Sequence, residues 1–190
     1  MNCILRIALV CIALASAGAA AQSVDYARSR ITCVSTQMKV PVEAEFRRFK
    51  AQLAFDPAQP EAGSAQIEID LASFDIGSEE VNVEARGRNW FDVGNHPRAR
   101  FVSASARALG AGRYEARGPL AIKGRTHDTV VPFTVTADAA GNAIFEGAFA
   151  VRRLQYGIGE GVWKDTDTVA DEVQIRFRLV TSGKPLQKKP

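Results

Sequence analysis

The sequence is short of cysteine and histidine and almost balanced in charge, and each shortage argues against a class of protein. Of its three cysteines, Cys3 and Cys11 lie in a leader that we expect to be removed. Cys33 then remains alone, so no intramolecular disulfide is possible. The two histidines, His96 and His127, form no spaced pair of the HExxH type, which argues against a metal site. With 24 basic and 21 acidic side chains, the chain is not strongly basic, and we expect no nucleic-acid partner.

The first 21 residues predict a secretory signal peptide. A single arginine supplies the positive charge, "IALVCIALA" is a nine-residue apolar core, and "SAGAAA" offers small residues for cleavage between Ala21 and Gln22. The core is too short to span a bilayer, which needs about 20 apolar residues. We therefore expect an exported, periplasmic protein with one domain over residues 22–182. Residues 183–190, "GKPLQKKP", are predicted to be a flexible basic tail that could give a transient membrane contact.

Alternating polar and apolar residues predict an antiparallel sheet with one dry face. In "EVQIRFRLV", Val173, Ile175, Phe177 and Leu179 fall on one side and polar residues on the other, which is typical of a half-buried strand. Cys33 lies on the apolar side of a similar run and is predicted to be a small buried hydrophobe. Eight strands are predicted in all, at residues 24–35, 43–55, 65–71, 98–106, 113–123, 128–137, 143–153 and 172–180.

The connection between the third and fourth strands predicts a short helix. It reads "GSEEVNVEARGRNWFDVGNHP", in which a serine followed by glutamates is a helix N-terminus signal and a proline ends the segment. Many short strands with regular turn signals indicate a sandwich or a closed barrel, and closure is favoured because it leaves no exposed edge. The predicted fold is therefore all-β, an eight-stranded antiparallel barrel with one short helix.

The residues on the inner face allow two interpretations of the barrel interior. An eight-stranded barrel has the size at which side chains either fill the inside or leave room for one small ligand. The inward positions mix large rings with residues that have small side chains, such as Ala51, Ala65, Ala116, Gly118 and Gly147. This mixture fits either a tapered, packed core or a slot with aromatic walls. The inward rings are Phe49, Phe101, Tyr114, Phe133, Phe145, Phe149 and Phe177.

The segment "KGRTHD" places five polar side chains between two apolar runs, as an active-site loop would. A hairpin bend also explains it, because the chain must reverse there and turns favour polar residues. No GxSxG motif occurs, and "GIGEG" is not followed by a helix that could receive a phosphate. The residues therefore predict no catalytic group and no metal, and an enzyme of unknown substrate that uses His127 stays an alternative.

Four stretches resemble the YceI-like proteins, and the resemblance covers nearly all of the chain after the leader. They are "MKVPVEAEFRRFKAQLAFDP", "WFDVGNHPRARF", "GPLAIKGRTHDTVVPF" and "FEGAFAVRRLQYGIGEGVWKDTDTVADEVQIRFRL". Members of that family are exported bacterial proteins with an extended lipocalin-like barrel that bind polyisoprenoids, isoprenoid quinones or related long-chain lipids. Many relatives carry His-Ser where this chain has Ser29 and Arg30, and a glycine where it has Glu45.

The resemblance implies a lipocalin-like barrel that acts as a periplasmic carrier or reservoir and breaks no bond. The seven inward rings would line an isoprenoid or quinone-like lipid, although ordinary core packing is the alternative for each of them. Four aromatic residues at the rim would gate entry or stack on a headgroup, namely Trp90, Phe91, Tyr156 and Trp163. Relatives suggest a homodimer. A stress-related interaction module that acts through its outer surface is a further alternative.

Overall fold

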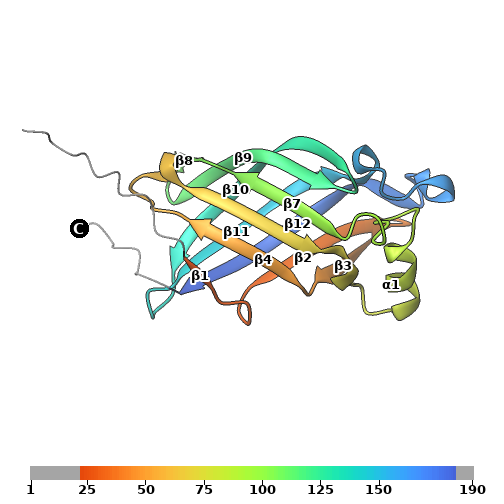
Figure 1. Cartoon of the computed structure of the whole chain (residues 1–190), viewed down its shortest axis with the longest axis horizontal. Helices are drawn as coiled ribbons and strands as arrows, with labels where there is room; N and C mark the ends of the chain where they lie inside the picture. Colours follow the sequence, from red (N-terminus) through yellow and green to blue (C-terminus); the bar gives the residue numbers. More distant parts are fainter. Residues whose placement is uncertain (1–21, 183–190) are drawn as a thin grey trace, which may run out of the picture.

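A computed structural model describes residues 22–182, which form twelve β-strands, one α-helix and four short 3-10 helices (Figure 1). The predicted signal peptide with Ala21, and the predicted tail 183–190, lie outside the described residues. No helix within 22–182 is long and apolar enough to cross a membrane. The helices are α1 (Glu79–Arg86), η1 (Pro60–Ala62), η2 (Leu71–Ser73), η3 (Arg153–Tyr156) and η4 (Gly161–Lys164). The strands are β1 (Ser23–Val24), β2 (Arg30–Gln37), β3 (Val40–Phe46), β4 (Phe49–Ala54), β5 (Ser64–Asp70), β6 (Phe74–Asp75), β7 (Arg98–Ser103), β8 (Ala106–Gly110), β9 (Arg113–Ile122), β10 (Arg125–Ala137), β11 (Ala143–Arg152) and β12 (Val169–Ser182).

The predicted number of eight strands was wrong, because bends divide several of the predicted strands. Three of them each form two strands, β1 with β2, β3 with β4, and β7 with β8, and the short β6 is an additional strand after β5. The bend between β3 and β4 is held by η2, where the amide of Arg47 donates to the carbonyl of Ser73 at 3.2 Å. Buried positions also change there from even to odd numbers, from Phe46 to Ala51.

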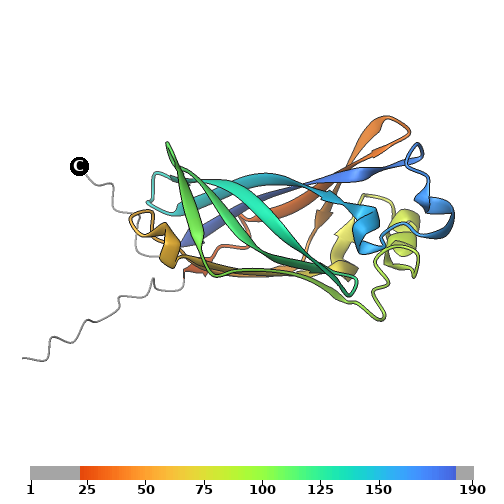
Figure 2. The same ribbon diagram turned by 90° about the horizontal axis from the view of Figure 1, so that it is seen from above.

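The strands form one antiparallel sheet that curls into a half-barrel (Figures 1 and 2). Their hydrogen-bonded order is β4-β5-β7-β9-β10-β11-β12-β2-β3-β6, with β8 beside β9. At one end, β1 pairs Ser23 with Ser182 of β12, and Gln22 forms a bridge to Leu53 of β4. The predicted all-β antiparallel fold with one helix is therefore confirmed, but the sheet is a curled half-barrel and not the predicted closed barrel.

Helix α1 lies at the other end of the curled sheet, between the third and fourth predicted strands as expected (Figure 1). Ser78 is its N-cap, and the two glutamates that follow it suit the positive end of the helix dipole. Asn82 is buried and fastens the helix to β6, because its amide donates to Asp75 at 2.9 Å and its oxygen accepts from the amide of Ile76 at 3.0 Å. The helix is thus fixed across this end of the sheet.

The end of the sheet that is opposite α1 contains a packed aromatic cluster. The ring of Phe55 lies at its centre, 5.0 Å from Tyr114, 5.6 Å from Phe133 and 5.7 Å from Phe145 between ring centroids. All three contacts are edge-to-face, an arrangement that aromatic pairs favour. Side chains from strands that are distant in sequence therefore hold this end together.

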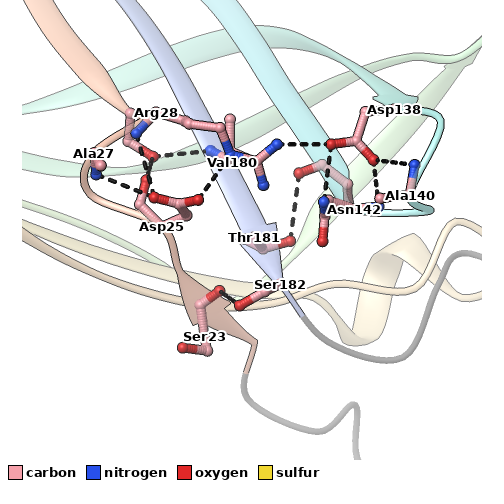
Figure 3. Close-up of polar contacts among 12 residues, drawn as sticks. Ser23, Asp25, Ala27, Arg28, Asp138, Ala140, Asn142, Val180, Thr181 and Ser182 are labelled. Atoms are coloured by element: carbon pink, nitrogen blue, oxygen red, sulfur yellow. Dashed lines mark hydrogen bonds and ion pairs between the residues drawn. The ribbon is translucent and has the colours of Figure 1, made fainter.

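A polar network centred on Asp138 ties the loops at the same end (Figure 3). Its carboxylate accepts hydrogen bonds from the amides of Ala140 and Asn142 at 3.0 and 2.9 Å, and from the guanidinium of Arg28 at 2.8 Å. Arg28 also pairs with Asp25 at 2.7 Å, so the loop after β1 is joined to the turn between β10 and β11. Hydrogen bonds from the side chains of Asn142 and Arg28 lower the pKa of Asp138 to about 2.

We expect Asp138→Asn to lower the melting temperature at neutral pH, because the ionised acceptor of this network is lost. A carboxylate whose folded pKa is lowered stabilises the protein above its ordinary pKa of 3.8 and stops doing so as the pH falls through about 2. The difference from the unsubstituted protein should therefore shrink across that range in thermal unfolding followed by circular dichroism. Asp128→Asn, at an exposed position of β10, is the control. Equal effects of the two substitutions at neutral pH would contradict the assignment.

Candidate functional site

Two neighbouring chambers, which share part of their lining, lie inside the curled sheet. The narrow chamber, of about 120 Å³, lies next to the aromatic cluster, and the wide chamber, of about 650 Å³, lies beside α1. The wide chamber falls within the range of about 300–1,000 Å³ that is usual for ligand pockets. The interior is therefore a slot with aromatic walls and not a filled core. The residues that line both chambers are Ile69, Ala99, Leu120, Phe149 and Ile175.

The narrow chamber is lined mainly by apolar side chains, and small residues make its room. Ala65 and Ala116 lie on its wall among the rings. Gly147 pairs with Phe177 across the strands, and a Cβ there would approach the ring of Phe177 to 2.6 Å. Gly147 does not itself line the chamber, but its lack of a side chain lets the ring of Phe177, which does line it, lie close to β11. Five of the seven rings predicted to point inward line this chamber, namely Phe101, Phe133, Phe145, Phe149 and Phe177.

The other two predicted interior rings, Phe49 and Tyr114, line neither chamber. Phe49 packs edge-on against Tyr26 with 5.5 Å between ring centroids, and Tyr114 stacks on Phe133 at 5.5 Å, behind the chamber wall. Phe55, which was not in the predicted ligand set, does line the narrow chamber. Alternation along a strand gives the face of a side chain, but the curl of the sheet decides whether that side chain reaches the hollow.

Three of the four aromatic residues predicted for the rim line the wide chamber, namely Trp90, Phe91 and Trp163. The indoles of Trp90 and Trp163 pack with 5.5 Å between centroids. The indole nitrogen of Trp163 donates to the carboxylate of Glu84 on α1 at 3.1 Å, which joins η4 to the helix. The fourth residue, Tyr156, is buried but lines neither chamber, since its ring packs on that of His127 at 4.9 Å.

Arg153 is a buried cation in the wall of the wide chamber, and the sequence analysis missed its role. Its guanidinium donates five hydrogen bonds of 2.7–3.2 Å, all to backbone carbonyls, so no N–H group is left for a ligand. Burial lowers the pKa of Arg153, and the carboxylate of Asp171 opposes this shift. The acceptors lie on η4, on the start of β12 and in the loop after η3, namely Ile158, Gly159, Trp163, Val169 and Ala170.

The segment "KGRTHD" is a hairpin whose reversal uses only two residues. Lys123 and Gly124 connect β9 to β10, with φ values of 47° and 71°. Such two-residue turns match the twist of the strands they join. The ammonium of Lys123 donates to the carbonyls of Arg88 and Gly157 at 2.8 and 2.6 Å. The polar bend therefore fastens the loops beside the wide chamber.

His127 lies on β10 rather than in the turn, and it is exposed. One nitrogen of its ring is 3.3 Å from the carbonyl of Gln155. Within residues 22–182, no three His, Cys, Asp or Glu side chains gather closely enough to hold a metal ion. The hollow and not this histidine is therefore the candidate site.

Ser29, Arg30 and Glu45, at which the expected family pattern is not followed, lie outside the hollow. The hydroxyl of Ser29 accepts from the amide of Val180 at 2.9 Å. Arg30 and Glu45 form an ion pair of 3.2 Å between partly exposed side chains. Ser29, Arg30 and Glu45 line neither chamber, so these substitutions do not alter the chamber walls directly.

Cys33 lines the wide chamber and is 8% exposed, which confirms the predicted small buried hydrophobe. Burial raises the pKa of its thiol from an ordinary 9.0 to about 12, and the carboxylate of Glu43 adds to the shift. The thiol is therefore protonated at neutral pH, and the reactive thiolate is scarce.

We expect Cys33 to react with iodoacetamide at pH 8 about a thousandfold more slowly in the folded protein than in urea, because the raised pKa removes the thiolate. Peptide mapping by mass spectrometry follows Cys33 separately from Cys3 and Cys11. Similar rates in the folded and unfolded protein would show that the thiol is neither buried nor shifted in pKa.

We expect Arg153→Met to lower the free energy of unfolding by about 3–5 kcal/mol, because several buried carbonyls lose their donor. Arg153→Lys keeps the charge but has only three donors, so its loss should be smaller. Urea unfolding measures both variants against Arg152→Met, at the exposed neighbouring position. If Arg153→Met and Arg152→Met unfold alike, Arg153 does not hold the loops together.

Comparison with known proteins agrees with this architecture. The crystal structure of BcnA from Burkholderia cenocepacia matches with a TM-score of 0.82 and 44% identity, over 84% of this chain and 100% of that chain. A structure described as a polyisoprenoid binding domain from Saccharophagus degradans, implicated in plant cell wall breakdown, matches with a TM-score of 0.68 and 18% identity, over 85% and 98%. A UPF0312 protein of Azotobacter vinelandii is 27% identical over 135 residues, 68% of each chain. The YceI-like domain family matches residues 23–181, and the chain therefore belongs to the YceI-like family.

Proposed function

We propose that this protein binds one long-chain apolar lipid, such as an isoprenoid or an isoprenoid quinone, inside the hollow of its sheet. The observation that carries the proposal is a pair of neighbouring chambers that have largely apolar walls and share five lining residues. Membership of the YceI-like family supports this ligand class, and so does the polyisoprenoid-binding description of the Saccharophagus degradans domain. With the predicted export signal, the protein is a periplasmic carrier or reservoir.

A carrier is needed because a prenyl tail does not leave a membrane readily for water. Burial of each CH₂ group contributes about 0.8 kcal/mol, so each five-carbon unit contributes roughly 3–4 kcal/mol. The hollow supplies an apolar surface for the tail while the outer face of the sheet stays in water. Binding of this kind requires no bond to break and no catalytic group.

The end of the tail lies in the narrow chamber, and the rest of the tail and the polar head lie in the wide one. In the narrow chamber, the hydroxyl of Ser103 already donates to the carbonyl of Ser105 at 2.7 Å. The wide chamber instead presents Gln37 and the carboxylates of Glu80 and Glu84. The rings of the narrow chamber contact the tail, and Trp90, Phe91 and Trp163 surround the head. Phe49, Tyr114 and Tyr156 support the walls from behind.

Ala99 offers the sharpest test, because it is 4% exposed and lines both chambers. Ala99→Trp should fill part of both chambers and weaken binding of a long-chain prenol by about tenfold or more, which corresponds to about 1.4 kcal/mol. The measurement is a titration with the prenol supplied from cyclodextrin and followed by tryptophan fluorescence or by melting temperature. Ala148→Trp, at an exposed position of β11, is the matched control.

Circular dichroism and thermal unfolding first establish that each variant folds, since overpacking a core costs about 1–3 kcal/mol. Ala99→Leu takes the place of the tryptophan variant if that one is unfolded. Equal binding by the folded Ala99 and Ala148 variants would place the lipid outside the hollow and overturn the proposal.

A further inference from the structure

Exposed apolar side chains gather at the opening of the wide chamber. Met38 is 75% exposed and Val162 is 83% exposed, which are large fractions for apolar residues. Three of the eight large exposed hydrophobic residues within 22–182 lie elsewhere, namely Tyr26, Leu109 and Val130. The other five, which we call the apolar rim, are Met38, Val40, Val81, Val83 and Val162.

The apolar rim comes from three segments that hydrogen bonds join into one surface. The amide of Met38, in the turn between β2 and β3, donates to the carbonyl of Thr168 at 2.9 Å. Trp163, next to Val162, donates to Glu84 of α1 at 3.1 Å. Figure 2 shows the β2–β3 hairpin, η4 and α1 together at one end of the sheet.

The rim is continuous with the hollow. Val81 and Val83 belong both to the rim and to the lining of the wide chamber. Gln37 and Trp163, which also line that chamber, are the chain neighbours of Met38 and Val162. A lipid that enters or leaves the wide chamber here therefore passes directly beside the exposed apolar side chains. Contiguous exposed apolar surface of this kind marks interaction sites.

The charges around the rim do not favour an anionic partner. Over segments 38–40, 79–88 and 160–168, six carboxylates outnumber four basic side chains. The last residue described, Ser182, pairs with Ser23 at the end of the sheet that is opposite the rim. Contact with a membrane through this surface would depend on apolar insertion and not on attraction between charges.

We propose that the apolar rim docks on a phospholipid bilayer by inserting Met38, Val40 and Val162, so that the wide chamber opens onto the membrane. This inference rests on the proposed lipid-binding function and names the partner from which the lipid is taken. A docked rim lets the tail move from bilayer to hollow without crossing water. Val81 and Val83 of α1, which are exposed and also line the wide chamber, lie beside this contact.

Flotation of the protein with phosphatidylcholine vesicles tests the proposal. Met38→Asp with Val162→Asp should lower the vesicle-bound fraction, and the rate of prenol transfer from vesicles, by about tenfold or more. Leu109→Asp with Val130→Asp is the matched control, since both positions are exposed away from the rim. Added anionic lipid and raised salt should change the binding of the unsubstituted protein little.

Binding of the same prenol from cyclodextrin separates this inference from the proposed function. We expect the rim variant to bind it as the unsubstituted protein does, which also establishes that the variant folds. Vesicle binding that is equal in the two double variants would overturn membrane docking by the rim. So would a rim variant that only changes the protein from dimer to monomer, because the rim would then be an interface between two copies. Failure of the unsubstituted protein to bind prenol from cyclodextrin would overturn the proposed function itself.

Discussion

The inner face of the curled sheet must be apolar and yet must not fill the space that it encloses. Protein interiors normally pack as densely as organic crystals, because each void removes dispersion contacts from the side chains around it. Here Ala65, Ala99 and Ala116 stand among large rings and leave two neighbouring chambers unfilled. A slender hydrocarbon would add the contacts that these walls do not make with each other. Ligand binding of this kind would also stabilise the folded state.

A sheet with a hollow centre has to be held at its two ends, and this protein holds them by different means. The end that is opposite α1 combines edge-to-face rings around Phe55 with the polar network of Asp138. The end with the opening is organised by Arg153, whose five donors are all used by backbone carbonyls. Arg153 therefore orders these loops through backbone carbonyls, from a position in the wall of the wide chamber. One end is thus packed, while the other stays open to a ligand.

Alternation in the sequence was sufficient to predict the sheet and its dry face, and the serine followed by glutamates at residues 78–80 was sufficient to predict the single helix. It was not sufficient for the strand count, although the change of buried positions from Phe46 to Ala51 does mark a bend. Arg153 continues the series of inward-facing odd-numbered residues that includes Phe149 and Val151. A charged residue at an inward position was therefore the signal in the sequence that could have identified its structural role. The depth of Phe49 and Tyr114 could not be read from alternation, because depth depends on how the sheet curls. The rim likewise depends on contacts between distant segments, such as that of Met38 with Thr168.

Mass spectrometry of an organic extract tests the central claim most directly. The protein is to be purified from a bacterial host without detergent, so that any lipid in the hollow is retained. The account predicts close to one equivalent of a long-chain apolar lipid per chain. Extracts from repeated preparations that contain no such lipid would contradict it.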